Sequence, residues 1–178
     1  GSETDGSILC PASQNGVVGI KPSAGLVSNA GVVPLSARQD VVGPMATSVA
    51  MAAKVLEVIA EGNPRYPLDA AALGGAKLGI AQGISSSPFH PGALRLFERA
   101  VVDLRAAGAE VSDRDVSWAN DAMLGRAELT ALLYEFNAGI AEYLEARGGT
   151  LRTVSDLIAF NRAHADAELK LFGQEIFE

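Results

Sequence analysis

Residues 1–22 read Gly1-Ser2-Glu3-Thr4-Asp5-Gly6-Ser7-Ile8-Leu9-Cys10-Pro11-Ala12-Ser13-Gln14-Asn15-Gly16-Val17-Val18-Gly19-Ile20-Lys21-Pro22, a polar loop followed by a short β-branched segment. A turn is expected at Cys10-Pro11. Gly6 can adopt backbone angles that other residues resist, so Ser7 can lie on a tight bend with its hydroxyl exposed. Successive amides around such a bend can converge on an anion. A serine beside convergent N–H groups suits acyl transfer, whose tetrahedral oxyanion needs donors already in place.

This stretch resembles the amidase signature family, in particular its peptide-amidase-like branch. The likeness continues through Gly25-Leu26-Val27-Ser28 and Gln39-Asp40-Val41-Val42-Gly43-Pro44-Met45-Ala46. Family enzymes use a serine nucleophile, a second serine on a cis peptide bond, and a lysine. The resemblance implies that Ser7 is the nucleophile. It also implies that the oxyanion is held by the backbone amides of Thr4, Asp5, Gly6 and Ser7.

In that family the lysine and the cis-serine lie upstream of the nucleophile loop, and residue 1 of this chain falls at the loop. We therefore expect residues 1–178 to be a partial amidase signature domain that holds one member of the triad. The isolated chain is expected to show no amidase activity. The implied fold class is α/β, a mixed β-sheet core covered by helices on both sides, of which this chain supplies a portion.

Several charged residues near the loop could take part in chemistry. Lys21 is the local candidate for the base, but it ends a strand before a proline and the family places its lysine elsewhere, so a structural role is favoured. Glu3 and Asp5 could form an acid–base pair. In a tight loop, Glu3 is more simply a structural group, and Asp5 contributes through its amide. Asp40 falls on a family motif position and is expected to brace the site.

Four further residues are candidates for nucleophile, base or specificity group. Cys10 is interpreted as a small residue buried under the loop rather than a nucleophile. His90 is expected to be exposed and His164 to be packed, and neither is favoured as a base. Leu9 stands where many family members have arginine, which argues against recognition of an ionised carboxylate at that point.

Composition limits the partners. The 178 residues are 48% hydrophobic and 6% aromatic, with a net charge of −7 and one cysteine. This balance indicates a packed α/β protein, gives no basic surface for nucleic acid, and allows no internal disulfide. No segment approaches the roughly 18 apolar residues of a membrane span. The expected partner is a small-molecule or peptide amide, with no metal or cofactor. A cytoplasmic location is the default, and a homodimer is left open.

Periodicity predicts an alternation of strands and helices. The segment 22–47, rich in glycine and proline, is expected to wrap back around the nucleophile loop. Ser48 or Thr47 is a predicted N-cap, and so is Ser155. Strands are expected over 16–21, 77–81 and from 109, and helices over 48–59, 92–107, 120–146 and 155–171. The strand–helix–strand order at 77–111 predicts a βαβ unit with parallel strands.

The resemblance favours hydrolysis of a carboxamide to a carboxylate and ammonia through a serine acyl-enzyme. A second interpretation is the A subunit of an amidotransferase that acts on charged tRNA. The acidic net charge and Leu9 argue modestly against this interpretation. A third is a non-catalytic relative kept as a binding scaffold.

Overall fold

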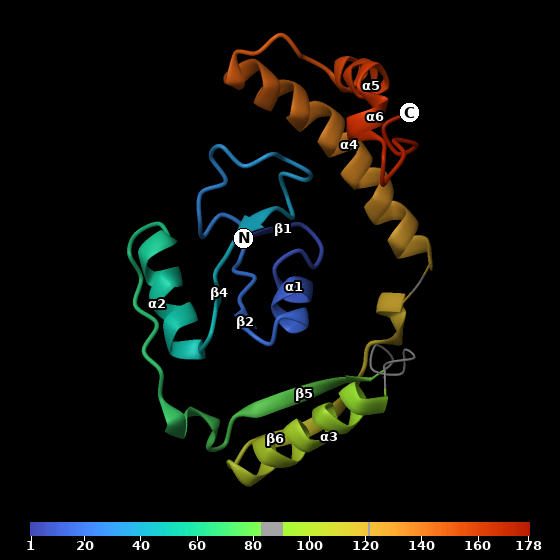
Figure 1. Cartoon of the computed structure of the whole chain (residues 1–178). Coiled ribbons are helices and arrows are strands. Elements are labelled where there is room, and N and C mark those ends of the chain that lie inside the picture. The colour runs from blue at the N-terminus through green and yellow to red at the C-terminus, as the bar shows by residue number, and fades with distance from the viewer. Residues whose placement is uncertain (83–90, 121) are drawn as a thin grey trace. The chain divides into compact units, whose positions relative to one another are not determined.

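The computed structural model describes residues 1–82, 91–120 and 122–178. His90, which is expected to be exposed, lies outside the described residues. The chain divides into two compact units, one formed by residues 1–66 and 129–178 and the other by residues 67–128. Helices and short β-pairs give the mixed α/β class that the sequence predicts (Figure 1). In the described residues the strands form three two-stranded sheets.

Two antiparallel pairs organise the N-terminal part of the first unit. Strand β1 (Ser2–Glu3) pairs with β3 (Val41–Val42), and β2 (Val18–Gly19) pairs with β4 (Met45–Ala46). Gly1 and Gly43 add two bonds, because the Gly1 amino group donates to the Gly43 carbonyl at 2.9 Å and the Gly43 amide donates back at 3.0 Å. The predicted return of segment 22–47 to the start of the chain is therefore confirmed.

The turn predicted at Cys10-Pro11 is wrong, because both residues lie in helix α1 (Leu9–Gln14). Proline is tolerated in the first turn of a helix, where its missing N–H would have no intrahelical partner. The prediction that Cys10 is buried is also wrong, since its side chain is exposed. Ile8 is the buried anchor beneath the loop, with 0% exposure. The helix turns Cys10 outward and leaves Ile8 facing the core.

Helix α2 (Val49–Ile59) begins as predicted, with the Ser48 hydroxyl accepting a hydrogen bond from the Met51 amide at 3.2 Å. Its buried residues are Ala52, Ala53 and Leu56. Leu56 packs with Val27 and Ala60 in the hydrophobic cluster of this unit. Val49, the first residue of the helix, is exposed.

The second unit contains the predicted βαβ arrangement. Its elements are η1 (Ala70–Leu73), β5 (Lys77–Gln82), α3 (Pro91–Ala106), β6 (Glu110–Asp115) and η2 (Ser117–Asn120). Strands β5 and β6 are parallel, in register from Lys77 opposite Glu110 to Gln82 opposite Asp115. On α3, Val101 is buried whereas Leu94 and Phe97 are exposed.

The remaining helices are α4 (Ala122–Arg147), α5 (Val154–Ala163) and α6 (Ala165–Glu168). The predicted cap at Ser155 is wrong, because Thr153 caps α5 in a reciprocal capping box with Asp156. The helix predicted over 155–171 breaks at His164. The His164 side chain is exposed and stacks on the Phe160 ring, with 4.2 Å between the ring centroids. Within the described ranges, no helix is both long and apolar enough to cross a bilayer.

Candidate active-site loop

Glu3 is the buried charge at the start of the loop, with a side chain that is 2% exposed. Its Oε2 atom accepts hydrogen bonds from the Ile8 amide at 2.7 Å and the Leu9 amide at 2.9 Å. Burial by itself raises the pKa of Glu3, but hydrogen bonds from the amides of Leu9, Ile8 and Gly6 and the charge of Lys21 outweigh it, so the pKa lies below its usual value. Glu3 therefore holds the backbone of the loop as an ionised carboxylate.

Lys21 is joined to the same loop. Its Nζ atom donates to the carbonyl oxygen of Thr4 at 2.6 Å and lies 3.5 Å from Glu3 Oε1. The ammonium group therefore ties the end of the β2 segment to the loop carbonyl and to the buried carboxylate. This geometry agrees with the structural role that the sequence favoured over a base.

Asp40 is joined to the loop through Thr4. This buried carboxylate accepts the Thr4 hydroxyl at Oδ1, 2.5 Å away. Its Oδ2 atom accepts the amides of Leu35 at 2.8 Å and Ser36 at 3.0 Å. Both Asp40 oxygens are thus fully used in positioning backbone and Thr4. The expected bracing position of Asp40 matches these contacts.

Ser7 follows Gly6 on the bend, and its side chain is exposed. Gly6 has φ +102°, a left-handed conformation that L side chains rarely adopt. The Cys10 amide closes the bend by donating to the Gly6 carbonyl at 2.7 Å. A pocket of about 80 Å³ opens beside Ser7, lined by Ser2, Glu3, Thr4, Ser7, Val32, Val33 and Asp40.

The loop amides differ in what they face. The Gly6 amide is directed at the Glu3 carboxylate. In the part of the chain that the structure describes, the amides of Thr4, Asp5 and Ser7 donate to no protein acceptor. Such donors, held by a fixed loop, can receive an anionic oxygen. Ser7 Oγ likewise has no basic side chain as a hydrogen-bond partner within residues 1–82, 91–120 and 122–178.

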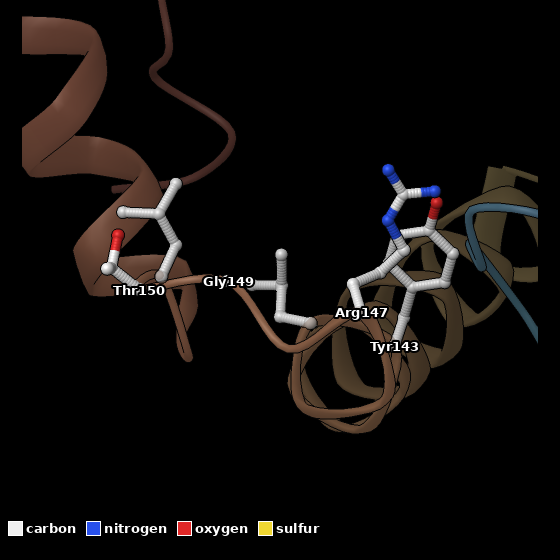
Figure 2. Close-up of a pocket in the computed structure, with 6 residues that line it drawn as sticks. Tyr143, Arg147, Gly149 and Thr150 are labelled. Atoms are coloured by element: carbon white, nitrogen blue, oxygen red, sulfur yellow. The ribbon is translucent and has the colours of Figure 1, made fainter.

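Among the described residues a metal cluster is absent, and a hollow beside α4 offers less chemistry. No group of three or more His, Cys, Asp and Glu side chains that could hold a metal ion occurs among the described residues. A hollow of about 450 Å³ lies where α4 turns toward α5, lined by Tyr143, Leu144, Arg147, Gly149, Thr150 and Leu151. Figure 2 shows the Arg147 side chain against the Tyr143 ring, with the guanidinium carbon 5.8 Å from the ring centroid. This hollow presents no carboxylate or histidine for proton transfer.

Comparison with known proteins shows which family this chain belongs to. The Amidase family model matches residues 1–170. A probable amidase of Arabidopsis thaliana is 39% identical over 99% of this chain and 37% of its own length. The crystal structure of the native peptide amidase from Stenotrophomonas maltophilia has 44% identity and a TM-score of 0.87, covering 99% of this chain and 39% of that one.

Together with the α/β architecture and the serine loop, these matches show that the chain belongs to the amidase family. The resemblance seen in the sequence is therefore confirmed. The A subunit of a glutamyl-tRNA(Gln) amidotransferase from Synechococcus is also similar, with 38% identity over 80% of this chain and 28% of its own length. The chain thus spans well under half the length of each of these relatives.

Proposed function

We propose that the intact protein hydrolyses a carboxamide through a serine acyl-enzyme. Ser7 Oγ attacks the carbonyl carbon and loses its proton to a Ser–cis-Ser–Lys relay whose other members lie outside the residues of this chain. The amides of Thr4, Asp5 and Ser7 receive the oxyanion, whereas the Gly6 amide faces the Glu3 carboxylate. Collapse of the intermediate breaks the C–N bond and releases ammonia with the relayed proton. Water then cleaves the ester to give the carboxylate and restore Ser7.

The observation that carries this proposal is the exposed Ser7 on the left-handed Gly6 bend, beside loop amides that have no acceptor among the described residues. The supports of this loop, Glu3 and Asp40, are themselves fully bonded. Oxyanion donors contribute most when they need no rearrangement during the reaction. A loop fixed on both sides meets that requirement without a metal or cofactor in any step.

The substrate we propose is a neutral amide, such as the terminal carboxamide of a peptide. Similarity to the Stenotrophomonas maltophilia peptide amidase supports this class. The side chains around Ser7 agree with it, because Val32 and Val33 line the pocket and Leu9 contributes an exposed apolar side chain. The same pocket is lined by the carboxylates of Glu3 and Asp40, whose negative charge disfavours an ionised acyl group relative to an uncharged one.

The experiment is to treat the intact protein with a fluorophosphonate probe, map the modified residue, and measure ammonia release from an amidated dipeptide. We expect modification at Ser7, and we expect Ser7→Ala to abolish both labelling and turnover. Ser13→Ala is the matched control, because Ser13 is also an exposed serine and lies nearby on α1. This variant should keep both labelling and turnover. Turnover at the normal rate by Ser7→Ala would refute the proposal. Absence of labelling and turnover in the unmodified protein would favour the non-catalytic scaffold.

A second candidate is the A subunit of a tRNA-dependent amidotransferase. The similarity to the Synechococcus protein supports it, whereas the net charge of −7 gives no attraction to tRNA. Purification at native expression levels separates the two functions. A component of an amidotransferase should co-purify with its partner proteins and release ammonia only in their presence, whereas an amidase should turn over the amidated dipeptide alone.

A further inference from the structure

Glu135 on helix α4 makes two contacts with the segment that carries Asp40. Its Oε2 atom accepts the Ser36 hydroxyl at 2.7 Å, and its Oε1 atom lies 3.0 Å from Arg38 Nε. The Glu135 side chain is 13% exposed and that of Arg38 is 86% exposed. An exposed ion pair is weak, so the part-buried hydrogen bond from Ser36 is the contact that fixes the position of Glu135.

Ser36 in turn is bonded directly to Asp40. The Ser36 amide donates to Asp40 Oδ2 at 3.0 Å, and the Asp40 amide donates to the Ser36 carbonyl at 2.8 Å. The remaining oxygen, Asp40 Oδ1, accepts the Thr4 hydroxyl. A continuous series of hydrogen bonds therefore runs from Glu135 through Ser36 and Asp40 to Thr4.

Helix α4 approaches the same segment one turn further on. A Cβ atom added at Gly139 would lie 3.2 Å from Pro34 Cβ, so the helix backbone and Pro34 are in close contact. Residues four apart share a helix face, and Glu135 and Gly139 thus form one contact surface against residues 34–40. All of these residues belong to the first compact unit.

We propose that Glu135 is a positioning residue for the reaction, acting through Ser36 and Asp40 on the Thr4 end of the nucleophile loop. The inference rests on the proposed function, because it assigns Glu135 to the support of the Thr4 amide as an oxyanion donor. Donors of this kind stabilise charge that develops only in the transition state. Loosening them lowers kcat and leaves substrate binding nearly unchanged.

The test compares Glu135→Ala, Glu135→Gln and Ser36→Ala in the intact protein. Glu135→Ala should lower kcat for the amidated dipeptide, and the rate of fluorophosphonate labelling, by about 10-fold, a fraction of the loss of a whole oxyanion donor. KM should change less than about 2-fold. Glu135→Gln keeps an oxygen for the Ser36 hydroxyl and should restore most of the rate. The double variant, Glu135→Ala with Ser36→Ala, should be no slower than the slower of the two single variants. Each substitution removes the same hydrogen bond between Ser36 and Glu135, so the two effects do not multiply.

Glu142→Ala is the matched control, since Glu142 is an exposed glutamate two turns further along α4. It should leave kcat unchanged. Equal rates for Glu135→Ala and Glu142→Ala, or multiplying effects in the double variant, would overturn the proposal. If Glu135→Ala does not fold, Glu135→Gln and Ser36→Ala decide in the same way, with Ser36→Ala expected to be slow and Glu135→Gln fast.

Hydrogen exchange separates this inference from the proposed function. Glu135→Ala should speed amide exchange in peptides covering residues 1–10 and 34–40, whatever reaction the protein performs. Exchange unchanged at residues 1–10 overturns the coupling even if Ser7 is the nucleophile. Faster exchange combined with full turnover by Ser7→Ala means that the coupling exists and that the proposed function is wrong.

Discussion

The Lys21 ammonium group donates a 2.6 Å hydrogen bond to the carbonyl oxygen of Thr4, so a lysine seventeen residues away in sequence holds the nucleophile loop by its backbone. Glu3 lies beside the same ammonium group at 3.5 Å. A lysine that functions in this way contributes to loop position rather than to proton transfer.

Lys21→Met should therefore weaken the protein without abolishing its chemistry. Loss of one charged hydrogen bond at a partly exposed site should cost about 1 kcal/mol of unfolding free energy. Labelling of Ser7 by a fluorophosphonate should fall by no more than about 10-fold, as expected for a displaced loop. Urea denaturation and labelling kinetics measure the two effects. A fall of about 1,000-fold or more with normal stability would instead make Lys21 the base.

Glu3→Gln should change the pH dependence of stability. The pKa of Glu3 is below the usual 4.5 in the folded state, because amides and Lys21 outweigh the cost of burial. The native protein therefore binds fewer protons than the unfolded chain between these two values, and this stabilisation is complete above pH 4.5. It is lost as the pH falls through the folded-state pKa. Urea midpoints measured from about pH 3 to about pH 7 should show a difference between unmodified protein and Glu3→Gln that shrinks on acidification. A difference that stays constant would contradict this account.

Asp40→Ala should destabilise the protein more than Thr4→Val. Removal of the carboxylate leaves the Leu35 and Ser36 amides without their acceptor, at about 1–3 kcal/mol each. Thr4→Val removes a single donor. The effect of Thr4→Val should disappear when Asp40 is already alanine, because the two residues share one hydrogen bond. Chemical denaturation of the four proteins completes this cycle, and additive losses would show that the bond is energetically unimportant.

Gly43→Ala should be severely destabilising. Its new Cβ would overlap the Ile20 carbonyl oxygen, a backbone atom in the β2–β4 region that has no room to move aside. A loss of about 3 kcal/mol or more is expected. Gly125→Ala is the matched control, because that glycine lies on α4 with nothing within 4 Å. It should stabilise the protein by up to about 1 kcal/mol. Similar thermal midpoints for the two variants would contradict the close packing at Gly43.

Thr153→Ala should remove the N-cap of α5 and lower stability by about 1 kcal/mol. Ser155→Ala changes a hydroxyl two residues further on, inside the helix, and should alter stability by less than about 0.5 kcal/mol. Thermal unfolding of both variants distinguishes the cap seen in the structure from the one predicted by periodicity. The reverse order of effects would support Ser155.

These last two residues illustrate what could be predicted from sequence. Helix existence at 154–163 follows from the apolar period, but Thr153 and Ser155 are both good caps, and the choice depends on Asp156 reaching back to the Thr153 amide. The parallel pairing of β5 and β6 was predictable because a helix of suitable length joins the two predicted strands. The helical state of Cys10-Pro11 was not, because it depends on Glu3 accepting the amides that open α1.

The site was predictable to a similar depth. The bend at Gly6 beside Ser7 could be predicted from local sequence, because glycine readily adopts the left-handed backbone conformation that this bend has. The partners of Thr4 and Ser36 do not, because Asp40 and Glu135 reach them across 36 and 99 residues of sequence. Periodicity describes neighbours along the chain and contains no information about such pairings.

The outward side chain of Cys10 makes the loop open to spectroscopy. It is the single thiol in these 178 residues, is accessible, and lies on the first helical turn after Ser7. A trifluoromethyl tag attached there would give one fluorine resonance, and the shift and width of that resonance would report ordering of the loop as an inhibitor occupies Ser7. Alkylating agents carry the converse risk, because a bulky adduct at Cys10 could obstruct Ser7 and imitate inactivation of the serine itself.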